Sequence, residues 1–579
     1  MGLPSLIRRS WAWVRRRDVT VWYDTAYRLP LSGLHLSAGM EPRRADYVAW
    51  WLRRRGAVSA ESFRAPRRVT YAELSRVHTA EYLESLSRPE TLARIFAVDP
   101  SDVPVDELMN TIRLACGATL EAARETLRTR APALNLLGGF HHADPANGGG
   151  FCPVNDVAVA VAALRADGFA SRVVVLDLDA HPPDGIALTL KDDPRHWIGS
   201  ISGSDWGHLE GVDETVLPAH AGDDAYLTAL RKLLARMPRC RIAFVIAGGD
   251  VLAGDRMGKL GLSLDGVRQR DLLVASALEG RPSVWLPAGG YTRQAWRAFA
   301  GTGMAVAIRS REKIPDKYDP LSERFAGISA SMTLGDLGDA TDLSAEDIEE
   351  ALGMRPQRQK LLLGFYTASG IENALFQYGI ADQAQRLGYG NLRVELDASG
   401  PGERIRVHGE ANGEEHLLCE TILEKRRVIG FEVLFIHWLL LRNPRAQFSQ
   451  RRPQLPGQEA PGLGLAREAG EMLGRMAVRL RLRGVAFRPA HYHTAYSARH
   501  DFTFVDPARQ GRFEAMVRDL AGVSLLEATE AVTAGKATMN GAPYAWEADE
   551  MIYWIRSGLP LDRGAVELER ARVRFELPR

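Results

Sequence analysis

Between residues 19 and 308, short apolar runs alternate with longer helix-like stretches, and this alternation limits the possible fold more than any other feature. A short apolar run bounded by Gly or Asp is typical of a strand buried on both faces of a parallel sheet. Helical stretches between such strands indicate crossovers that cover both faces. We therefore predict an α/β domain. Its predicted strands are residues 19–22, 134–137, 173–176, 242–246 and 283–286, and its predicted helices include residues 108–127, 156–166 and 225–235.

Length and charge restrict the class of protein and its partners. The 579 residues, 46% of them hydrophobic and 25% charged, predict a soluble globular protein with at least two domains. Lys and Arg number 73 against 72 for Asp and Glu, so no overall charge attracts a polyanion. We therefore predict no direct contact with nucleic acid, and the oligomeric state stays open.

Cysteine usage and hydropathy predict a cytoplasmic protein. The cysteines, four in number, are widely separated and form no CxxC pair, which fits a reducing compartment. The basic start, residues 1–17, has no apolar core of secretory length and is predicted to form a surface helix rather than a membrane-touching one. No later segment has the apolar length of a transmembrane helix.

The character of the sequence changes after residue 308. We predict one domain over residues 1–320, a linker over 321–345 and an α+β domain of unknown role over 346–579. A capping-box pattern predicts a helix from 344 to about 353. Further on, the sequence predicts strands at residues 392–396, 404–407, 417–423 and 431–441, and a helix at residues 465–481.

Residues suited to catalysis follow the predicted strands in each of four segments. In an open parallel sheet, the carboxyl ends of the strands meet at one edge, where ligand sites are built. We therefore expect these segments to form one site. They are residues 134–143 with 149–156, residues 177–185, residues 247–258 and residues 286–292.

The residue types in these segments predict a hydrolytic metal site. Asp179, His181 and Asp250 supply two carboxylates and an imidazole, which suit Zn²⁺ with a fourth position left for water or substrate. Hydrolysis also needs a proton acceptor and a donor to the scissile carbonyl. The histidine pair at 141–142 and the phenol of Tyr291 supply these groups.

Together the segments resemble the histone deacetylase family, which includes acetylpolyamine amidohydrolases and acetoin-utilisation proteins. The resemblance covers roughly residues 19–308. Within the family, this part of the sequence is similar to the small class IV enzymes in particular. It rests on Gly-x-His-His-Ala at 139–143, Gly-Phe-Cys-x-x-Asn-Asp at 150–156, Asp-x-Asp-x-His at 177–181, Gly-x-Asp-x-x-x-Gly-Asp at 248–255 and Gly-Gly-Tyr at 289–291. It implies an arginase/deacetylase-type three-layer fold with a mainly parallel sheet. It also implies a zinc-dependent deacylase that hydrolyses acetyl-lysine or a related acylated amine with a metal-activated water.

The resemblance also assigns roles to single residues. It implies that zinc is held by Asp179, His181 and Asp250, and that Tyr291 donates to the carbonyl and then to the oxyanion. It further implies that His142 is the general base and then the acid, oriented by Asp184, while His141 pairs with Asp177.

Two further expectations come from the resemblance. Asp177 is expected to help hold a structural monovalent cation, with residues 200–201 on the other side, so K⁺ is a second predicted ion. Gly150 and Phe151 are expected to line a narrow channel for the acyl-lysine substrate.

The sequence departs from the family pattern at the loop after His181. The family usually continues with His-Gly-Asp-Gly, whereas this chain has Pro182-Pro183-Asp184-Gly185. Proline fixes φ near −65° and restricts the residue before it, so we expect the loop to take another path. That change would affect Asp184 and, through it, the basicity of His142.

The rim of the channel departs as well. The stretch 201–208 does not match the usual Ser-x-His-x-Phe, and Trp206 is the candidate for the second channel wall. Polyamine-selective relatives carry a Glu where this chain has Met257. An apolar rim favours acyl-lysine or a longer acyl chain over a cationic polyamine.

Two alternatives stay open for this half. An arginase-like dimanganese site shares the Asp-Ala-His segment but needs a further Asp where Pro183 stands, so a single-metal site is favoured. A degenerate module that retains zinc and binds an acylated ligand without hydrolysing it is the alternative from another class.

The second half contains two weaker signals. Residues 491–496 alternate like a strand and would place His491 and His493 on one face, as a possible second metal site. The loop 457–464 loosely resembles the pyrophosphate-binding loop of GNAT acetyltransferases, with Glu459 at the Gln/Arg position. His78 and His35 match family positions and are expected to support packing or the rim.

Overall fold

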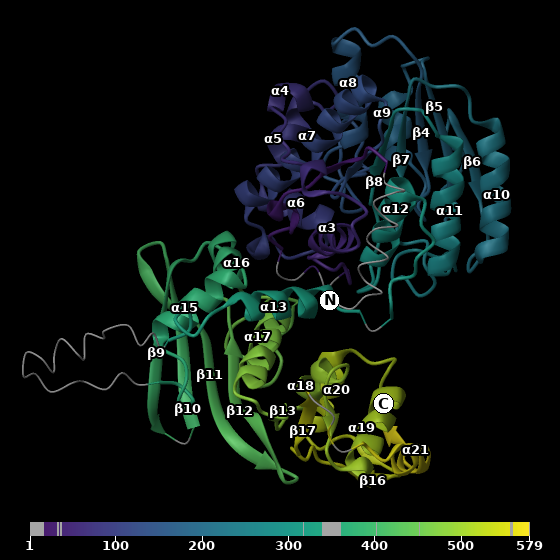
Figure 1. The fold of residues 1–579 in the computed structure, drawn as a ribbon. Coiled ribbons are helices and arrows are strands. Elements are labelled where there is room, and N and C mark those ends of the chain that lie inside the picture. The colour runs from purple at the N-terminus through teal and green to yellow at the C-terminus, as the bar shows by residue number, and fades with distance from the viewer. Residues whose placement is uncertain are drawn as a thin grey trace, which may run out of the picture. The chain divides into compact units, whose positions relative to one another are not determined.

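The structure is a computed structural model that describes residues 17–338, except 32, 33, 35–37 and 317, and residues 361–577, except 401, 451, 556, 557 and 559, with the backbone alone at 398 and 399. It divides into two compact units, Met1–Pro320 and Leu321–Arg579 (Figure 1). The helices predicted at the basic start of the chain and at 344–353 lie outside the described residues, as does His35.

The first unit is built on an eight-stranded sheet in the order β2-β1-β3-β8-β7-β4-β5-β6. Each pair of neighbouring strands runs parallel. The α/β prediction is therefore confirmed. The strands are β1 Thr20–Trp22, β2 Phe63–Arg64, β3 Ala133–Asn135, β4 Val173–Asp177, β5 His196–Ser202, β6 Val212–Val216, β7 Ile242–Ile246 and β8 Ser283–Leu286.

Helices cover both faces of this sheet, because β4 and β7 are buried at every position. In one row of helices, α10 packs on β5 and β6, α11 packs on α10, α12 packs on α11, and α3 packs on α12. In the other row, α7 packs on β1, β3 and β8, α8 packs on α7, and α9 packs on α8. The helices are α3 Arg44–Arg54, α4 Tyr71–Leu74, α5 Ala80–Ser85, α6 Pro89–Phe96, α7 Val105–Thr129, α8 Asp156–Ala166, α9 Asp184–Leu190, α10 Asp223–Arg236, α11 Leu264–Ala277 and α12 Trp296–Ile308, with short 3-10 turns at Thr25–Tyr27, Ala60–Ser62 and Pro100–Asp102.

The register of the sheet brings the carboxyl ends of neighbouring strands to one edge. Asp177, the last residue of β4, pairs with Ser200 on β5 and with Ile246 at the end of β7. Ile246 in turn pairs with Leu286 at the end of β8. The loops that follow β3, β8, β7 and β4 therefore leave the sheet side by side, and these loops carry the residues singled out from the sequence.

The second unit contains a seven-stranded mixed sheet in the order β14-β17-β13-β12-β11-β10-β9. β9 to β12 form an antiparallel meander, and β13 pairs with β12 in parallel after the crossover helix α17. The predicted α+β class is confirmed. The strands are β9 Gly390–Gly400, β10 Gly402–Ala411, β11 Glu414–Val428, β12 Phe431–Leu441, β13 Gly484–Phe487, β14 Thr503–Phe504 and β17 Met551–Trp554, with β15 Thr538–Met539, β16 Ala542–Pro543 and β18 Phe575–Glu576 in a three-stranded sheet.

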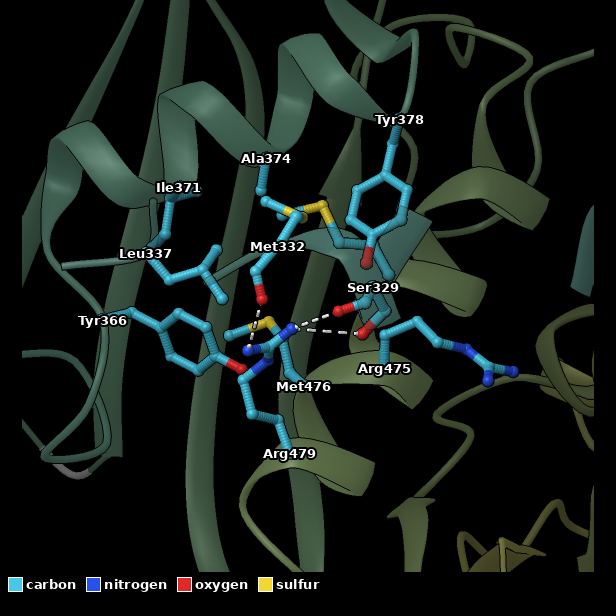
Figure 2. A pocket seen from close by; sticks show the side chains of 11 residues that line it. Ser329, Met332, Leu337, Tyr366, Ile371, Ala374, Tyr378, Arg475, Met476 and Arg479 are labelled. Atoms are coloured by element: carbon cyan, nitrogen blue, oxygen red, sulfur yellow. Dashed lines mark hydrogen bonds between the residues drawn. The ribbon is translucent and has the colours of Figure 1, made fainter. Parts of the chain in front are cut away.

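Helices of this unit include α13, which begins at the division between the units. Arg479 on α17 donates to the carbonyl oxygens of Ser329 (2.6 Å) and Met332 (3.3 Å), at a small cavity lined by Tyr366 and Tyr378 (Figure 2). The segment predicted as a linker therefore begins with a helix that packs on α17. The helices are α13 Pro320–Ser331, α15 Ala368–Gln377, α16 Ile380–Arg386, α17 Ala466–Arg479, α18 Tyr492–Ala498, α19 Pro507–Asp519, α20 Leu525–Thr533 and α21 Arg563–Arg572.

Candidate active site

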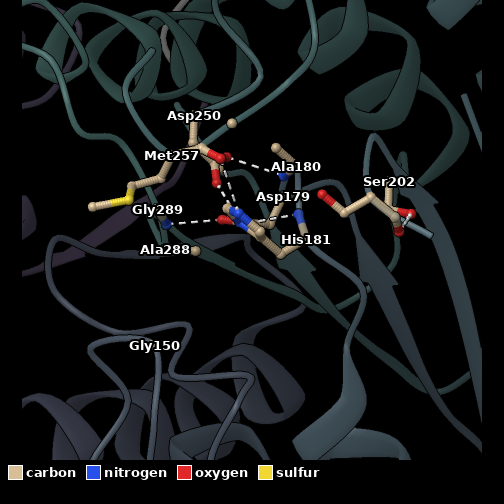
Figure 3. Close-up of polar contacts among 12 residues, drawn as sticks. Gly150, Asp179, Ala180, His181, Ser202, Asp250, Met257, Ala288 and Gly289 are labelled. Atoms are coloured by element: carbon tan, nitrogen blue, oxygen red, sulfur yellow. Dashed lines mark hydrogen bonds and ion pairs between the residues drawn. The ribbon is translucent and has the colours of Figure 1, made fainter. Parts of the chain in front are cut away.

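Three side chains with metal-binding atoms meet where β4 and β7 end. Asp179 and His181 follow β4, and Asp250 follows β7, its neighbour in the sheet. The ligand atoms all lie within 4.8 Å of one another. His181 Nδ1 is 3.2 Å from Asp179 Oδ1 and 3.0 Å from Asp250 Oδ2 (Figure 3). In the described parts of the chain, no other group of His, Cys, Asp and Glu side chains is arranged to hold a metal ion.

Backbone N–H groups hold both carboxylates in place. Gly289 donates to Asp179 Oδ2 (2.8 Å), and Ala180 donates to Asp250 Oδ1 (3.0 Å). A Cβ at position 289 would lie 2.6 Å from Asp250 Oδ2 and 2.7 Å from Asp179 Oδ2. Glycine is therefore required there, because any side chain would push into the carboxylate pair.

The donor set fits a zinc ion. Zinc bonds of about 2.0–2.1 Å in a tetrahedral site place neighbouring ligand atoms roughly 3.3 Å apart. The contacts of His181 Nδ1 with Asp179 and Asp250, at 3.2 and 3.0 Å, are close to that spacing. His181 Nε2 lies 3.3 Å from the carbonyl oxygen of Met257 and donates to it, which leaves Nδ1 to face the metal position.

Electrostatics also favour a cation at this point. Burial raises the pKa of Asp250, and the Asp179 charge raises it further. Burial opposes ionisation of Asp179 too, but His141 and His181 lower its pKa well below the ordinary value. Burial lowers the pKa of His181, and its contacts with the two carboxylates outweigh that and raise it to about 11. The carboxylates of Asp179 and Asp250 are at most 1% exposed and lie close together, so their combined negative charge attracts a cation.

The histidine pair lies beside this cluster, each ring oriented by its own carboxylate. His141 Nδ1 is 2.8 Å from Asp177 Oδ2, and His142 Nδ1 is 2.6 Å from Asp184 Oδ1. The two rings lie 4.0 Å apart between centroids, and His142 lies 5.8 Å from the His181 ring. Burial lowers the pKa of His141, but Asp177 and Asp179 raise it to about 9. For His142, burial and the neighbouring His141 lower the pKa despite Asp184.

The two prolines lie directly before helix α9, which begins at Asp184 with Pro183 as its N-cap. The N–H of Ile186 in this helix donates to the carbonyl oxygen of His141 (3.0 Å). A Cβ at Gly185 would lie 2.4 Å from the carbonyl carbon of His142, so the helix and the histidine segment are in close contact. The loop with Pro182 and Pro183 thus ends with Asp184 in hydrogen-bond contact with His142.

Two hydrogen bonds to the backbone fix the loop that carries Tyr291 next to the carboxylate cluster. Its N–H donates to Asp255 Oδ2 (2.7 Å), and the half-buried Arg44 donates to the carbonyl oxygen of Ala288 (2.9 Å) in the same loop. Burial raises the pKa of the phenol well above its ordinary value, and the Asp179 and Asp250 charges add to this. Tyr291 therefore stays protonated at neutral pH and is available as a donor.

Phe151 and Gly150 approach the same position from the loop before α8. The Phe151 ring lies 5.0 Å from the Tyr291 ring, and its N–H donates to the carbonyl oxygen of Ile95 (3.1 Å). Phe151 has a φ of 65°, in the left-handed region, where a bulky residue stores strain. A Cβ at Gly150 would lie 2.4 Å from His142 Cδ2, so a larger residue would displace the histidine.

Trp206 and Met257 lie at the exposed side of the cluster. The Trp206 side chain is 51% exposed, yet its ring lies 5.3 Å from the His142 ring and 5.9 Å from the His181 ring. Met257 is 38% exposed and contacts His181 through its carbonyl oxygen. The structure thus brings both predicted rim residues to the edge of the site.

Asp177 sits deeper, beneath the metal cluster. Its Oδ1 accepts from the N–H of Asp179 (3.1 Å), while its Oδ2 contacts His141. Ser200 faces it across β4 and β5, and the buried Ser200 hydroxyl has no hydrogen-bond partner among the described residues. An unpaired buried hydroxyl beside a buried carboxylate fits a small cation at this position.

Three residues that support the site were not given a role there from the sequence. Asp255 accepts from the N–H groups of both Tyr291 and Met257, and Arg44 fixes the loop before Tyr291. Asp156 accepts from the N–H groups of Gly139 and Phe140, just before the histidine pair. Asp255 and Asp156 belong to motifs and could have been found there, whereas nothing in the sequence around Arg44 indicates its contact.

The prediction for residues 491–496 was wrong. This segment forms helix α18 with His491 as the N-cap, rather than a strand. The His491 and His493 rings stack at 5.4 Å, but no carboxylate or thiol joins them in a metal-type cluster within the described residues. His78, in contrast, is buried and bridges two backbone segments, as expected of a packing residue.

The first unit of this chain is similar in sequence to known proteins. The histone deacetylase domain model matches residues 38–306. Histone deacetylase 2 of Arabidopsis thaliana is 30% identical over 300 residues, which cover 49% of this chain and 77% of that protein. Histone deacetylase clr6 of Schizosaccharomyces pombe is 30% identical over 279 residues, or 43% of this chain and 68% of that protein. No helix in the described residues has both the length and the apolar character needed to cross a membrane.

Among solved structures, an HDAC homolog from Aquifex aeolicus is 24% identical, with a TM-score of 0.42, and covers 53% of this chain and 88% of its own. A crystal structure of an HDAC homolog complexed with SAHA gives the same values. An uncharacterised protein of Picosynechococcus is 31% identical over 260 residues, or 81% of its length. On the sequence identity and coverage of these relatives, this chain belongs to the histone deacetylase family.

Proposed function

We propose that the first unit is a zinc-dependent deacylase that hydrolyses the acyl amide of an acylated lysine or a small acylated amine. One observation carries this proposal: the Asp179, His181 and Asp250 cluster lies within ring contact of a histidine that is paired with its own carboxylate. This is the combination that metal-assisted amide hydrolysis requires, namely a Lewis acid site and a proton acceptor.

The residues of the chain divide the work as follows. Asp179, His181 and Asp250 would hold zinc, which polarises the substrate carbonyl and makes water a better nucleophile. His142, neutral because burial lowers its pKa, takes a proton from the attacking water and returns it to the leaving amine. Tyr291, protonated, donates to the oxygen of the former carbonyl.

The remaining contacts position these groups. Asp184 holds His142 at Nδ1, so that Nε2 faces the reaction. His141 is paired with Asp177, which fixes the orientation of its ring beside the site. We propose that Asp177 and Ser200 also hold a structural K⁺, which the unpaired hydroxyl of Ser200 supports.

The side chains around the entrance of the site select the substrate. Phe151 packs on Tyr291 and Trp206 packs on His142, so an acyl-lysine chain would pass between aromatic side chains. Met257 adds an apolar side chain at the edge, which favours an acylated lysine over a polyamine.

We place the enzyme in the cytoplasm, because its four cysteines are free thiols. We propose residues 1–320 as the hydrolase domain and 346–579 as a separate domain.

Turnover of a fluorogenic acyl-lysine panel by the full chain with zinc tests the proposal. We expect hydrolysis by the native protein and none by Asp250→Asn, which loses a metal ligand. Tight binding of an acyl-lysine peptide without turnover would instead establish the alternative, a degenerate module that holds an acylated ligand.

A further inference from the structure

The carboxylate of Asp255 has no task in the proposed reaction, although burying even part of a charged group costs free energy. Asp255 is half-buried and lies in the loop after β7, beyond the proposed metal ligand Asp250. The described contacts of its side-chain oxygens are all with backbone N–H groups. What these contacts hold in place therefore indicates what the carboxylate does.

One oxygen of this carboxylate holds the turn that contains Met257. Asp255 Oδ1 accepts from the N–H of Met257 (3.0 Å) and from the N–H of Gly258 (3.2 Å). The carbonyl oxygen of Met257 in turn accepts from Nε2 of His181 (3.3 Å). A Cβ at Gly258 would lie 1.8 Å from the carbonyl oxygen of Asp250, so the turn packs directly on the backbone of another proposed ligand. Oδ1 therefore fixes the carbonyl group that orients the imidazole of His181.

The other oxygen holds the loop after β8. Asp255 Oδ2 accepts from the N–H of Tyr291 at 2.7 Å, the shortest of the three contacts. Earlier in the same loop, Gly289 donates to Asp179 Oδ2 (2.8 Å). A Cβ at Gly39 would lie 2.6 Å from the carbonyl oxygen of Tyr291, so the backbone of Tyr291 is confined on that side as well. Oδ2 therefore fixes the backbone from which the phenol extends.

The two oxygens belong to one planar group, so together they connect the imidazole of His181 with the backbone of Tyr291. The path runs from Nε2 of His181 through the carbonyl and N–H groups of Met257 to Asp255, and from there to the N–H of Tyr291. The two loops that it joins follow β7 and β8, which are neighbours in the sheet. Metal ligands and oxyanion donors keep a productive geometry only when further hydrogen bonds hold them.

We propose that Asp255 is a positioning residue that sets the Tyr291 phenol relative to the metal ligand His181. The inference rests on the proposed deacylase function and assigns Asp255 a part in that reaction. Asp255 touches neither substrate nor metal and acts through the two backbone segments that it joins. Its loss should therefore lower kcat more than it raises KM, and it should lower kcat mainly through Tyr291.

Asp255→Ala removes both acceptor oxygens. Loss of such an orienting partner typically costs about 10–100-fold in activity, so we expect that fall in kcat on an acyl-lysine substrate, with KM little changed. Asp255→Asn keeps the shape and one acceptor oxygen, so it should lose less than the alanine variant, and it serves if the alanine variant does not fold. Asp192→Ala, at an exposed carboxylate just beyond α9, is the matched control.

A double-mutant cycle with Tyr291→Phe separates positioning of the phenol from general damage to the fold. If Asp255 acts through the phenol, Asp255→Ala should lower kcat strongly in the native background but little in a chain that already lacks the hydroxyl. Equal fold losses in the two backgrounds would overturn the proposal. A native kcat in Asp255→Ala alone would overturn it as well.

Zinc affinity gives a second readout that does not depend on turnover. Since the carbonyl group that orients His181 is held by the same carboxylate, we expect Asp255→Ala to bind zinc about tenfold more weakly in competition with a chelating dye. An unchanged affinity would contradict the connection to His181. If the native chain binds zinc but hydrolyses no acyl-lysine substrate, the proposed function fails, and the zinc affinity of Asp255→Ala still decides whether this connection exists.

Discussion

At the scale of single residues, the Tyr291 hydroxyl is the group with the most specific task. It is buried and protonated beside the carboxylate cluster. Removing one preorganised donor to an oxyanion typically costs about 10²–10³-fold in kcat. We expect Tyr291→Phe to lose about 10²-fold in kcat on an acyl-lysine substrate while it still binds zinc. Tyr71→Phe, at an exposed tyrosine, is the control. A normal rate in Tyr291→Phe would remove the phenol from the mechanism.

Asp184 is the residue whose role was least secure in the sequence, because two prolines precede it. The structure places its carboxylate 2.6 Å from His142 Nδ1. Loss of such an orienting carboxylate typically costs about 10–100-fold in activity. We therefore expect that fall in kcat for Asp184→Asn, with zinc affinity retained. Asp192→Asn, an exposed carboxylate just beyond α9, should behave like the native protein. If both variants keep the native rate, Asp184 does not orient the base.

The metal ligands, the histidine pair and Tyr291 could be named from the sequence because their motifs have fixed spacing and follow recognisable strands. Arg44 could not, because its contact with the carbonyl of Ala288 joins residues 244 positions apart. Ser200 could be placed near Asp177 from the family resemblance, but its unpaired hydroxyl is visible only in the structure.

At the scale of elements, the short apolar strands β1, β3, β4, β7 and β8 of the first sheet were predictable, whereas β2, β5 and β6 were missed. β7 and β8 have the predicted bounds, since each is a short and mainly apolar run that is buried at every position. β6 was missed because it lies at the edge of the sheet and carries charged, half-buried residues. The helix at α18 was mistaken for a strand because six alternating residues are too few to separate the two periods. Tyr492 and Ala495, one helical turn apart, are both buried there.

His78 links two elements and should make stability depend on pH. Its Nδ1 donates to the carbonyl oxygen of Asp144 (2.9 Å), and its Nε2 accepts from the N–H of Asn155, the N-cap of α8 (3.0 Å). Only neutral imidazole can make both bonds, and burial lowers its pKa to about 4. The unfolded chain then binds the proton more readily, so stability from His78 is full above pH 6.5 and is lost as the pH falls toward 4.

Urea unfolding of the native chain and of His78→Gln at pH 7 and pH 5 measures this effect. The glutamine does not titrate, so we expect the native chain to lose about 2 kcal/mol more than the variant between these pH values. Parallel losses in the two proteins would show that His78 is not the group that titrates.

At the scale of the whole molecule, the two units should respond differently to metal. The described metal-type cluster lies in the first unit alone. Binding to the folded state adds about 2.7 kcal/mol at a free zinc concentration 100 times Kd. We expect zinc to raise the unfolding temperature of the first unit in scanning calorimetry and to leave the second unit's unfolding unchanged. Asp250→Asn is the control for zinc binding elsewhere. A shift of equal size in that variant would contradict the assigned ligands.

The most direct test of the central claim is the hydrolysis rate of metal-stripped protein on a fluorogenic acyl-lysine substrate as zinc is added. Since Asp179, His181 and Asp250 form a single ligand cluster, activity should rise from background and reach its plateau at one zinc per chain. Full activity without zinc, or no turnover once one zinc is bound, would contradict the assignment of this chain as a zinc deacylase.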